Sequence, residues 1–334
     1  MKLEKIDLEK LFNSKDIPFT VKDFTVYEVV GLEKYSVSFN QNIVAKWVSK
    51  YDLDANVSEI LNNEDYIGDE TDGFLLIGSY CGETELTITE KQTPNSKKLK
   101  LVIISRFIKI SLDEMRKTIK NNEDANNEWK ALCNRNNCQK SKEKKELQIE
   151  DKEDKLYEMP TLYEVYVRCL IRKYVTDKNW VVLTGLKQCD TSRGDYKNCN
   201  VINATCKKVC DIQKANFQFQ NTSETIDAQV YLEGDVIPDI VLKKNNEEEY
   251  IIFDVKYKTG KTNAGTRSDR LQILAYAYMW NCKLIGHIFP ERSRDDILNI
   301  DISENSSVGY IELKCNTEDV FDMDLDKLLK NETN

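Results

Sequence analysis

The chain has 334 residues, of which 40% are hydrophobic and 31% charged, and its formal net charge is −9 at pH 7. This length allows two hydrophobic cores, and the composition is ordinary for a globular protein. The negative charge argues against tight nucleic-acid binding by the chain alone, although not against recruitment to a nucleic acid by a partner. No apolar run approaches the roughly 20 residues that span a bilayer, and the N-terminus lacks the apolar core of a signal peptide. We therefore expect a cytoplasmic protein without a membrane partner.

Residues 1–112 mix helical and strand patterns, which predicts an N-terminal α+β domain for partner docking or DNA contact. Three runs are typical of strands, and we expect the last to be buried on both faces: Phe74–Ile77, Glu85–Thr89 and Leu99–Ile110. Two segments have helical patterns: Gln41–Tyr51 and Val57–Leu61. No Gly-rich phosphate loop occurs in the sequence, so we expect the chain to bind no nucleotide itself.

Two polar segments follow. Residues 113–155 are poor in apolar side chains and rich in Asn, Lys and Glu, which predicts a charged connecting segment. Residues 187–229 are polar and weakly patterned, which predicts an insertion, and they contain four cysteines: Cys189, Cys199, Cys206 and Cys210. Their spacing matches no standard zinc site, and no secretion signal indicates a disulfide-forming compartment, so we expect free thiols.

Helical periodicity is present over Met159–Ile171, where Pro160 suits the first turn. Glu164 lies in the first turns, beside the apolar face of this predicted helix. It is explained either as an exposed acid that the helix dipole favours, or as a carboxylate that joins a metal site formed by later residues.

Two hydrophobic strands carry charged residues near the C-terminal end of the chain. Pro238–Leu242 contains Asp239, and Tyr250–Lys258 contains Asp254 and Lys256. A polar turn between the runs predicts a hairpin, which would bring Asp239 near Asp254. Two adjacent carboxylates repel one another unless a cation lies between them, and Mg²⁺ prefers oxygen ligands. Asp-x-Lys alone is very common, and charged residues at strand ends are often only solvated, but the full pattern favours a metal-dependent nuclease.

A further helix is predicted over Arg267–Trp280, with a core face formed by Leu271, Leu274, Ala275 and Tyr278. Gln272 and Tyr276 are four residues apart, on a flanking face of this helix. Basic residues predominate between residues 256 and 270, as a phosphodiester substrate requires. The only histidine, His287, lies in an apolar strand and is interpreted as structural.

These elements together resemble the PD-(D/E)xK nuclease superfamily. More narrowly, the segments LYEVYV, PDIVL, DVKYK and QILAYAY occur in the order found in the McrC family, the nuclease subunits of McrBC restriction systems. The resemblance implies an α/β fold whose C-terminal domain, residues 156–334, is restriction-endonuclease-like, with a mixed central sheet flanked by helices. It implies that Mg²⁺ or Mn²⁺ is held by Asp239, Asp254, the Val255 carbonyl and Glu164, and that Lys256 and Gln272 act on water or phosphate.

The resemblance also implies the partners, which are DNA and a McrB-like AAA+ GTPase subunit. Three alternatives stay open: a LlaJI-type restriction subunit, a standalone nuclease in defence or repair, and a non-enzymatic scaffold that binds DNA or a partner. Retention of the acidic, lysine and glutamine positions argues against the scaffold.

Overall fold

The computed structural model describes residues 3–15, 18–39, 45–53, 57–63, 65–127, 129, 155–176, 178, 180–182, 238–245, 249–258, 267–280, 282–303 and 306–330. The chain divides into two compact units: residues 1–108 with 136–162, and residues 109–135 with 163–334. No helix within the described ranges is long and apolar enough to cross a membrane.

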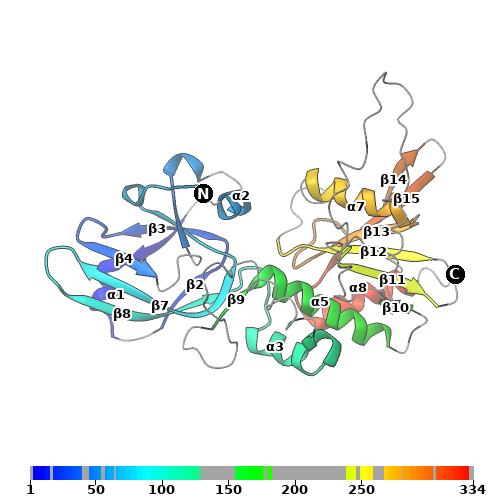
Figure 1. Ribbon diagram of the computed structural model, residues 1–334, viewed down its shortest axis with the longest axis horizontal. Helices are drawn as coiled ribbons and strands as arrows, with labels where there is room; N and C mark the ends of the chain where they lie inside the picture. Colours follow the sequence, from blue (N-terminus) through cyan, green and yellow to red (C-terminus); the bar gives the residue numbers. More distant parts are fainter. Residues whose placement is uncertain are drawn as a thin grey trace, which may run out of the picture. The chain divides into compact units, whose positions relative to one another are not determined.

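The first unit consists mainly of strands in two sheets (Figure 1). One sheet has the strand order β1-β3-β6-β5, and the other has the order β2-β8-β7-β4, with β9 paired to β7. The strands are β1 (Glu4–Asp7), β2 (Phe19–Lys22), β3 (Thr25–Val30), β4 (Tyr35–Phe39), β5 (Ala45–Val48), β6 (Phe74–Ile77), β7 (Tyr80–Glu90), β8 (Ser96–Ile104) and β9 (Lys155–Glu158). The helical elements are α1 (Leu8–Asn13), η1 (Lys50–Asp52), α2 (Val57–Asn62) and η2 (Glu70–Asp72).

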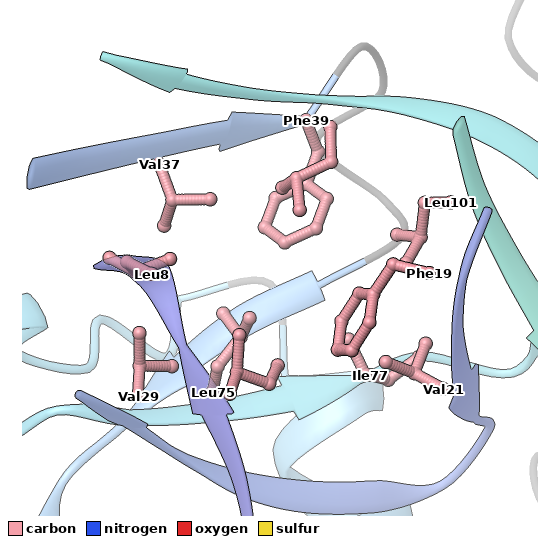
Figure 2. Close-up of a pocket in the computed structure, with 11 residues that line it drawn as sticks. Leu8, Phe19, Val21, Val29, Val37, Phe39, Leu75, Ile77 and Leu101 are labelled. Carbon is pink, nitrogen blue, oxygen red and sulfur yellow. The ribbon is translucent and has the colours of Figure 1, made fainter. Parts of the chain in front are cut away.

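Apolar side chains from both sheets and from α1 meet in the core of this unit. Figure 2 shows side chains that surround a small cavity there, among them Leu8, Phe19, Val21, Val29, Val37, Phe39, Leu75, Ile77 and Leu101. The cavity measures about 10 Å³, which is roughly the space that one water molecule needs. Its lining is apolar, so it is a packing void and not a ligand site.

Much of the predicted secondary structure of this unit is confirmed. Phe74–Ile77 is β6, and the run Glu85–Thr89 lies within the longer β7. The predicted helix Val57–Leu61 corresponds to α2.

Two predictions for this unit are wrong. Gln41–Tyr51 is not a helix, because Ala45–Val48 forms β5 and pairs antiparallel with β6. The run beginning at Leu99 is a strand, but buried and exposed residues alternate along it, so it is not buried on both faces. It ends at Ile104, whose side chain is exposed.

The second unit contains one mixed sheet with the strand order β10-β11-β12-β13-β15-β14. The pairs β12–β13 and β13–β15 are parallel, whereas β10–β11, β11–β12 and β14–β15 are antiparallel. Helix α7 covers one face of this sheet, and α5 and α8 lie on the other (Figure 1). The elements are α3 (Leu112–Lys120), α5 (Met159–Val175), β10 (Trp180–Val182), β11 (Ile240–Lys244), β12 (Tyr250–Val255), α7 (Arg267–Trp280), β13 (Leu284–Phe289), β14 (Leu298–Ser303), β15 (Ser306–Lys314) and α8 (Glu318–Lys330).

The predicted α/β class, with a mixed sheet and flanking helices, is confirmed. The polar segment 113–155 begins with an ordered helix, α3, in which Met115 and Ile119 are buried and Ser111 is the N-cap. The rest of that segment, apart from residues 121–127 and 129, lies outside the described residues, as does the cysteine-bearing segment 187–229.

Candidate active site

A row of polar side chains crosses the face of the second unit's sheet that α7 covers. The neighbouring row on this face is apolar and packs against α7: Val241, Ile252, Ile285 and Tyr310. Side chains alternate along strands, so the residues two positions further on share that face. The strand register places these in one transverse row: Asp239, Asp254, His287 and Glu312.

The carboxyl groups of Asp239 and Asp254 lie together at one end of this row, where Asp254 is buried and Asp239 is half-buried. Asp239 Oδ2 accepts a hydrogen bond from the Val255 N–H at 2.7 Å, which ties it to β12. Burial raises the pKa of Asp239 well above its ordinary value, and the charges of Glu164 and Asp254 raise it further. Burial also raises the pKa of Asp254, although Lys256 opposes this. Both shifts mean that two negative charges are unfavourable here without a compensating cation.

The donor set fits a hard divalent cation. Two carboxylates lie next to the Val255 backbone, and such cations take carboxylate and carbonyl oxygens. Among the described residues, no three Asp, Glu, His or Cys side chains are grouped closely enough to hold one ion. Glu164 instead pairs with Arg168, and its negative charge raises the pKa of Asp239.

Lys256 lies directly after β12 and faces this carboxylate pair. Its Nζ is 2.5 Å from Asp254 Oδ2 and 3.3 Å from Gln272 Oε1. Burial alone lowers the pKa of Lys256, but the charges of Asp254, Asp239 and Asp269 together raise it above its ordinary value. The side chain is therefore a fixed positive charge at neutral pH.

Helix α5 supplies Glu164, which forms an ion pair with Arg168 one turn later. The Arg168 guanidinium is buried, and its Nη1 also donates to the Asp239 backbone carbonyl at 3.4 Å. Arg168 thus links α5 to the start of β11. The sequence interpretation missed this residue, because an arginine on an amphipathic helix is expected to be solvated.

Arg168→Met is expected to lower the free energy of unfolding by about 1.5–3 kcal/mol, the contribution of hydrogen bonds to charged groups. Methionine keeps most of the side-chain volume but leaves Glu164 and the Asp239 carbonyl without the guanidinium. Urea denaturation measures the change, with Lys283→Met as the control because Lys283 is exposed. An unchanged midpoint would contradict the proposed link between α5 and β11.

Gln272 and Tyr276 lie one turn apart on α7. The Gln272 amide donates from Nε2 to Tyr276 Oη at 2.8 Å, while its Oε1 faces Lys256. Tyr276 is buried in the core beneath α7. Burial and the charges of Asp254 and Asp239 raise its pKa, so the hydroxyl stays protonated. Tyr276 holds the Gln272 side chain in place.

The buried face of α7 differs from the predicted one. Leu271 is 58% exposed, so the predicted core face through Leu271 and Ala275 is wrong. The helix instead buries Ile273, Tyr276 and Ala277 against the sheet. The helix is therefore rotated about its axis relative to the prediction, which places Gln272 at the edge of the buried face, next to Lys256.

His287 and Glu312 continue the polar row, and Tyr310 of the neighbouring row hydrogen-bonds to both; the sequence interpretation assigned none of the three to the site. His287 is fully buried, with Nε2 3.9 Å from Asp254 Oδ2 and Nδ1 2.9 Å from Tyr310 Oη. Burial lowers the pKa of His287 to about 3, so the imidazole is neutral. Tyr310 Oη donates to Glu312 Oε1 at 3.3 Å, and Glu312 Oε2 accepts from the Ser293 N–H at 2.7 Å. This network can be recognised only from the strand register, which a single sequence does not reveal.

The structure places Asp239, Asp254, Lys256 and Gln272 next to one another and Glu164 near Asp239, but within the described residues the three acids do not form a three-ligand group for one ion. Residues 154–290 match the family model described as "McrBC 5-methylcytosine restriction system component". This part of the chain is similar to that McrBC component.

The matched segment includes every predicted site residue as well as Arg168 and His287, whereas Tyr310 and Glu312 lie beyond it. A solved structure is similar to this chain with a TM-score of 0.30 and 10% identity, and the match covers 80% of this chain and 88% of that one. It is described as a half-complex from a tetradecameric assembly of Thermococcus gammatolerans McrB AAA+ hexamers with bound McrC. No curated protein matches the chain.

Proposed function

We propose that this chain is the nuclease subunit of a McrBC-like restriction system and hydrolyses DNA phosphodiester bonds with Mg²⁺ or Mn²⁺. The observation that carries the proposal is the pairing of the half-buried Asp239 with the buried Asp254 beside the Lys256 ammonium, within the segment that matches the McrBC family. Buried acids with perturbed pKa values that meet a fixed cation are typical of catalytic sites.

The carboxylates of Asp239 and Asp254 and the carbonyl of Val255 would hold the cation, with Glu164 acting through a water. The bound ion would supply positive charge to the phosphodiester and lower the pKa of a bound water. Gln272 presents an amide, fixed by Tyr276, that can hydrogen-bond a water or a phosphate oxygen.

Lys256 acts as a cation in this proposal and not as a base. In the metal-free site the charges of Asp254, Asp239 and Asp269 raise its pKa, so the side chain is protonated at neutral pH. An ammonium can instead donate hydrogen bonds that orient the nucleophilic water and stabilise the charge that develops on the phosphate.

The proposed partner is an AAA+ GTPase of the McrB type. Two properties of this chain favour such a partner. The sequence has no phosphate loop of its own, and its net charge of −9 does not favour DNA binding by the chain alone. The GTPase would hydrolyse nucleotide and recruit DNA, while this chain would cut it.

The test is a cleavage assay with the purified chain, with and without a McrB-type AAA+ GTPase from the same organism, on DNA with and without 5-methylcytosine. We expect cleavage that requires the divalent cation, the partner and GTP together. Cleavage by the chain and metal alone would instead support the standalone nuclease. Absence of both cleavage and Mn²⁺ binding would leave only the scaffold.

Lys256→Met is expected to reduce the cleavage rate by about 10²–10³-fold, the typical loss when one donor that stabilises the transition state is removed. Binding of Mn²⁺ should be retained or tightened, because the ammonium no longer occupies Asp254 Oδ2. Calorimetric titration with Mn²⁺ measures this second effect. If Mn²⁺ binding were lost together with cleavage, Lys256 would be required to maintain the metal site, and its role would not be catalytic.

A further inference from the structure

Lys256 has a second carboxylate near its ammonium group, and that carboxylate lies outside the predicted motif. Asp269, in the first turn of α7, places Oδ1 3.8 Å from Lys256 Nζ. Its Oδ2 forms a close ion pair with Lys258. Asp269 is only 7% exposed, so its carboxylate is largely shielded from solvent.

A metal ion bound by Asp254 would lie close to the Lys256 ammonium, which already contacts one of the two Asp254 oxygens. The ammonium is 2.5 Å from Asp254 Oδ2, whereas Asp269 Oδ1 lies farther away at 3.8 Å. A cation that used Asp254 Oδ2 would draw the ammonium away from it, because the two positive charges repel one another. The lysine side chain is 22% exposed, so losing its partner without replacement would be costly.

We propose that Asp269 is a positioning residue that takes over the Lys256 ammonium when a divalent cation occupies Asp254. This inference rests on the proposed function, since it requires a metal at Asp239 and Asp254. Gln272 Oε1, at 3.3 Å, assists the transfer and limits how far the side chain moves. Lys256 thereby remains beside the reacting phosphate and does not turn to solvent.

A simpler role for Asp269 makes a different prediction. An acid in the first turn of a helix is stabilised by the helix dipole, and its pairing with Lys258 would be enough to maintain it. On that account, removing its charge would affect stability and would weaken metal binding equally whether or not Lys256 is present.

The test is a double-mutant cycle on Mn²⁺ affinity, measured by calorimetric titration of the full chain. Asp269→Asn should weaken Mn²⁺ binding by about tenfold in the wild-type background, within the range for coupled neighbouring charges. In the Lys256→Met background the same substitution should weaken it by about threefold or less, because no ammonium then competes for Asp254. Equal losses in the two backgrounds would overturn the proposal.

Two variants control this cycle. Asp319→Asn removes an exposed carboxylate from the first turn of α8 and should leave Mn²⁺ affinity unchanged. Asp269→Glu keeps the charge and should recover most of the affinity. If Asp269→Asn does not fold, Asp269→Ser completes the same cycle, because serine also suits the start of a helix.

The outcomes separate this inference from the proposed function. Wild-type chain that binds no Mn²⁺ overturns both. Wild-type chain that binds Mn²⁺ and cleaves DNA, with additive effects of the two substitutions, overturns the role of Asp269 alone.

Discussion

Asp254→Asn is expected to reduce metal-dependent cleavage by about 10³-fold or more, because charge stabilisation by a bound ion is worth several kcal/mol and each 1.36 kcal/mol is a factor of ten. The amide keeps the shape of the side chain but removes the charge that would hold the cation opposite Asp239. Mn²⁺ should therefore raise the thermal midpoint of the wild-type protein and not that of the variant.

The same substitution should change the stability of the metal-free protein by no more than about 1 kcal/mol, because two effects oppose one another. Folding raises the pKa of Asp254, so its carboxylate lowers stability at neutral pH, and asparagine removes that cost. Against this, the ion pair with Lys256 is lost, but Asp269 and Gln272 remain near the ammonium.

The control for this prediction is Asp301→Asn, an exposed acid on β14 whose loss should change neither cleavage nor stability. If Asp254→Asn cleaved DNA at the wild-type rate in the presence of metal and partner, the Asp254 carboxylate would have no part in the mechanism.

The site residues that lie on the β11–β12 hairpin could be predicted from the sequence. Asp239 and Asp254 stand out because acids interrupt apolar strands, and the polar turn at residue 245 predicts the hairpin that makes them opposite neighbours. Lys256 follows from the alternation of side chains along one strand. These inferences need only local geometry, which is what a single sequence encodes best.

The missed residues depend on contacts between distant elements. His287 and Glu312 join the row only because β13 and β15 pair in a particular parallel register with β12. The buried Arg168 guanidinium contacts both the Glu164 carboxylate and the backbone carbonyl just before β11. Asp269 approaches Lys256 only once α7 packs on the sheet.

Tertiary context also explains the errors in secondary structure. β5 is a strand because Trp47 and its neighbours pair with β6, which lies almost thirty residues later, and this pairing overrides the helical pattern. On α7, apolar residues occur on more than one face, so periodicity alone did not decide whether Leu271 or Ile273 faces the core.

Gly286→Ala is expected to destabilise the second unit by about 3 kcal/mol or more, at the upper end of the range for overpacked cores. Gly286 lies in β13 between β12 and β15, and a Cβ there would be 2.2 Å from the Ile311 carbonyl oxygen and 2.9 Å from Phe253 Cε1. The carbonyl belongs to the backbone of β15 and cannot move without disturbing the β13–β15 pairing. That pairing also carries His287 and Glu312, so the damage would extend to the row behind Asp254.

Gly309→Ala is the matched control, since Gly309 lies in the same sheet and pairs with Leu284. The nearest atom to its added Cβ would be Leu284 Cδ1 at 2.9 Å, the end of a side chain that can shift. We expect this variant to cost about 1 kcal/mol. Thermal unfolding, with hydrogen exchange followed over β13 and β15, distinguishes the two variants. Equal stability of both would mean that β13 and β15 can separate at Gly286, and that the strand pairing which aligns His287 with Asp254 is not rigid.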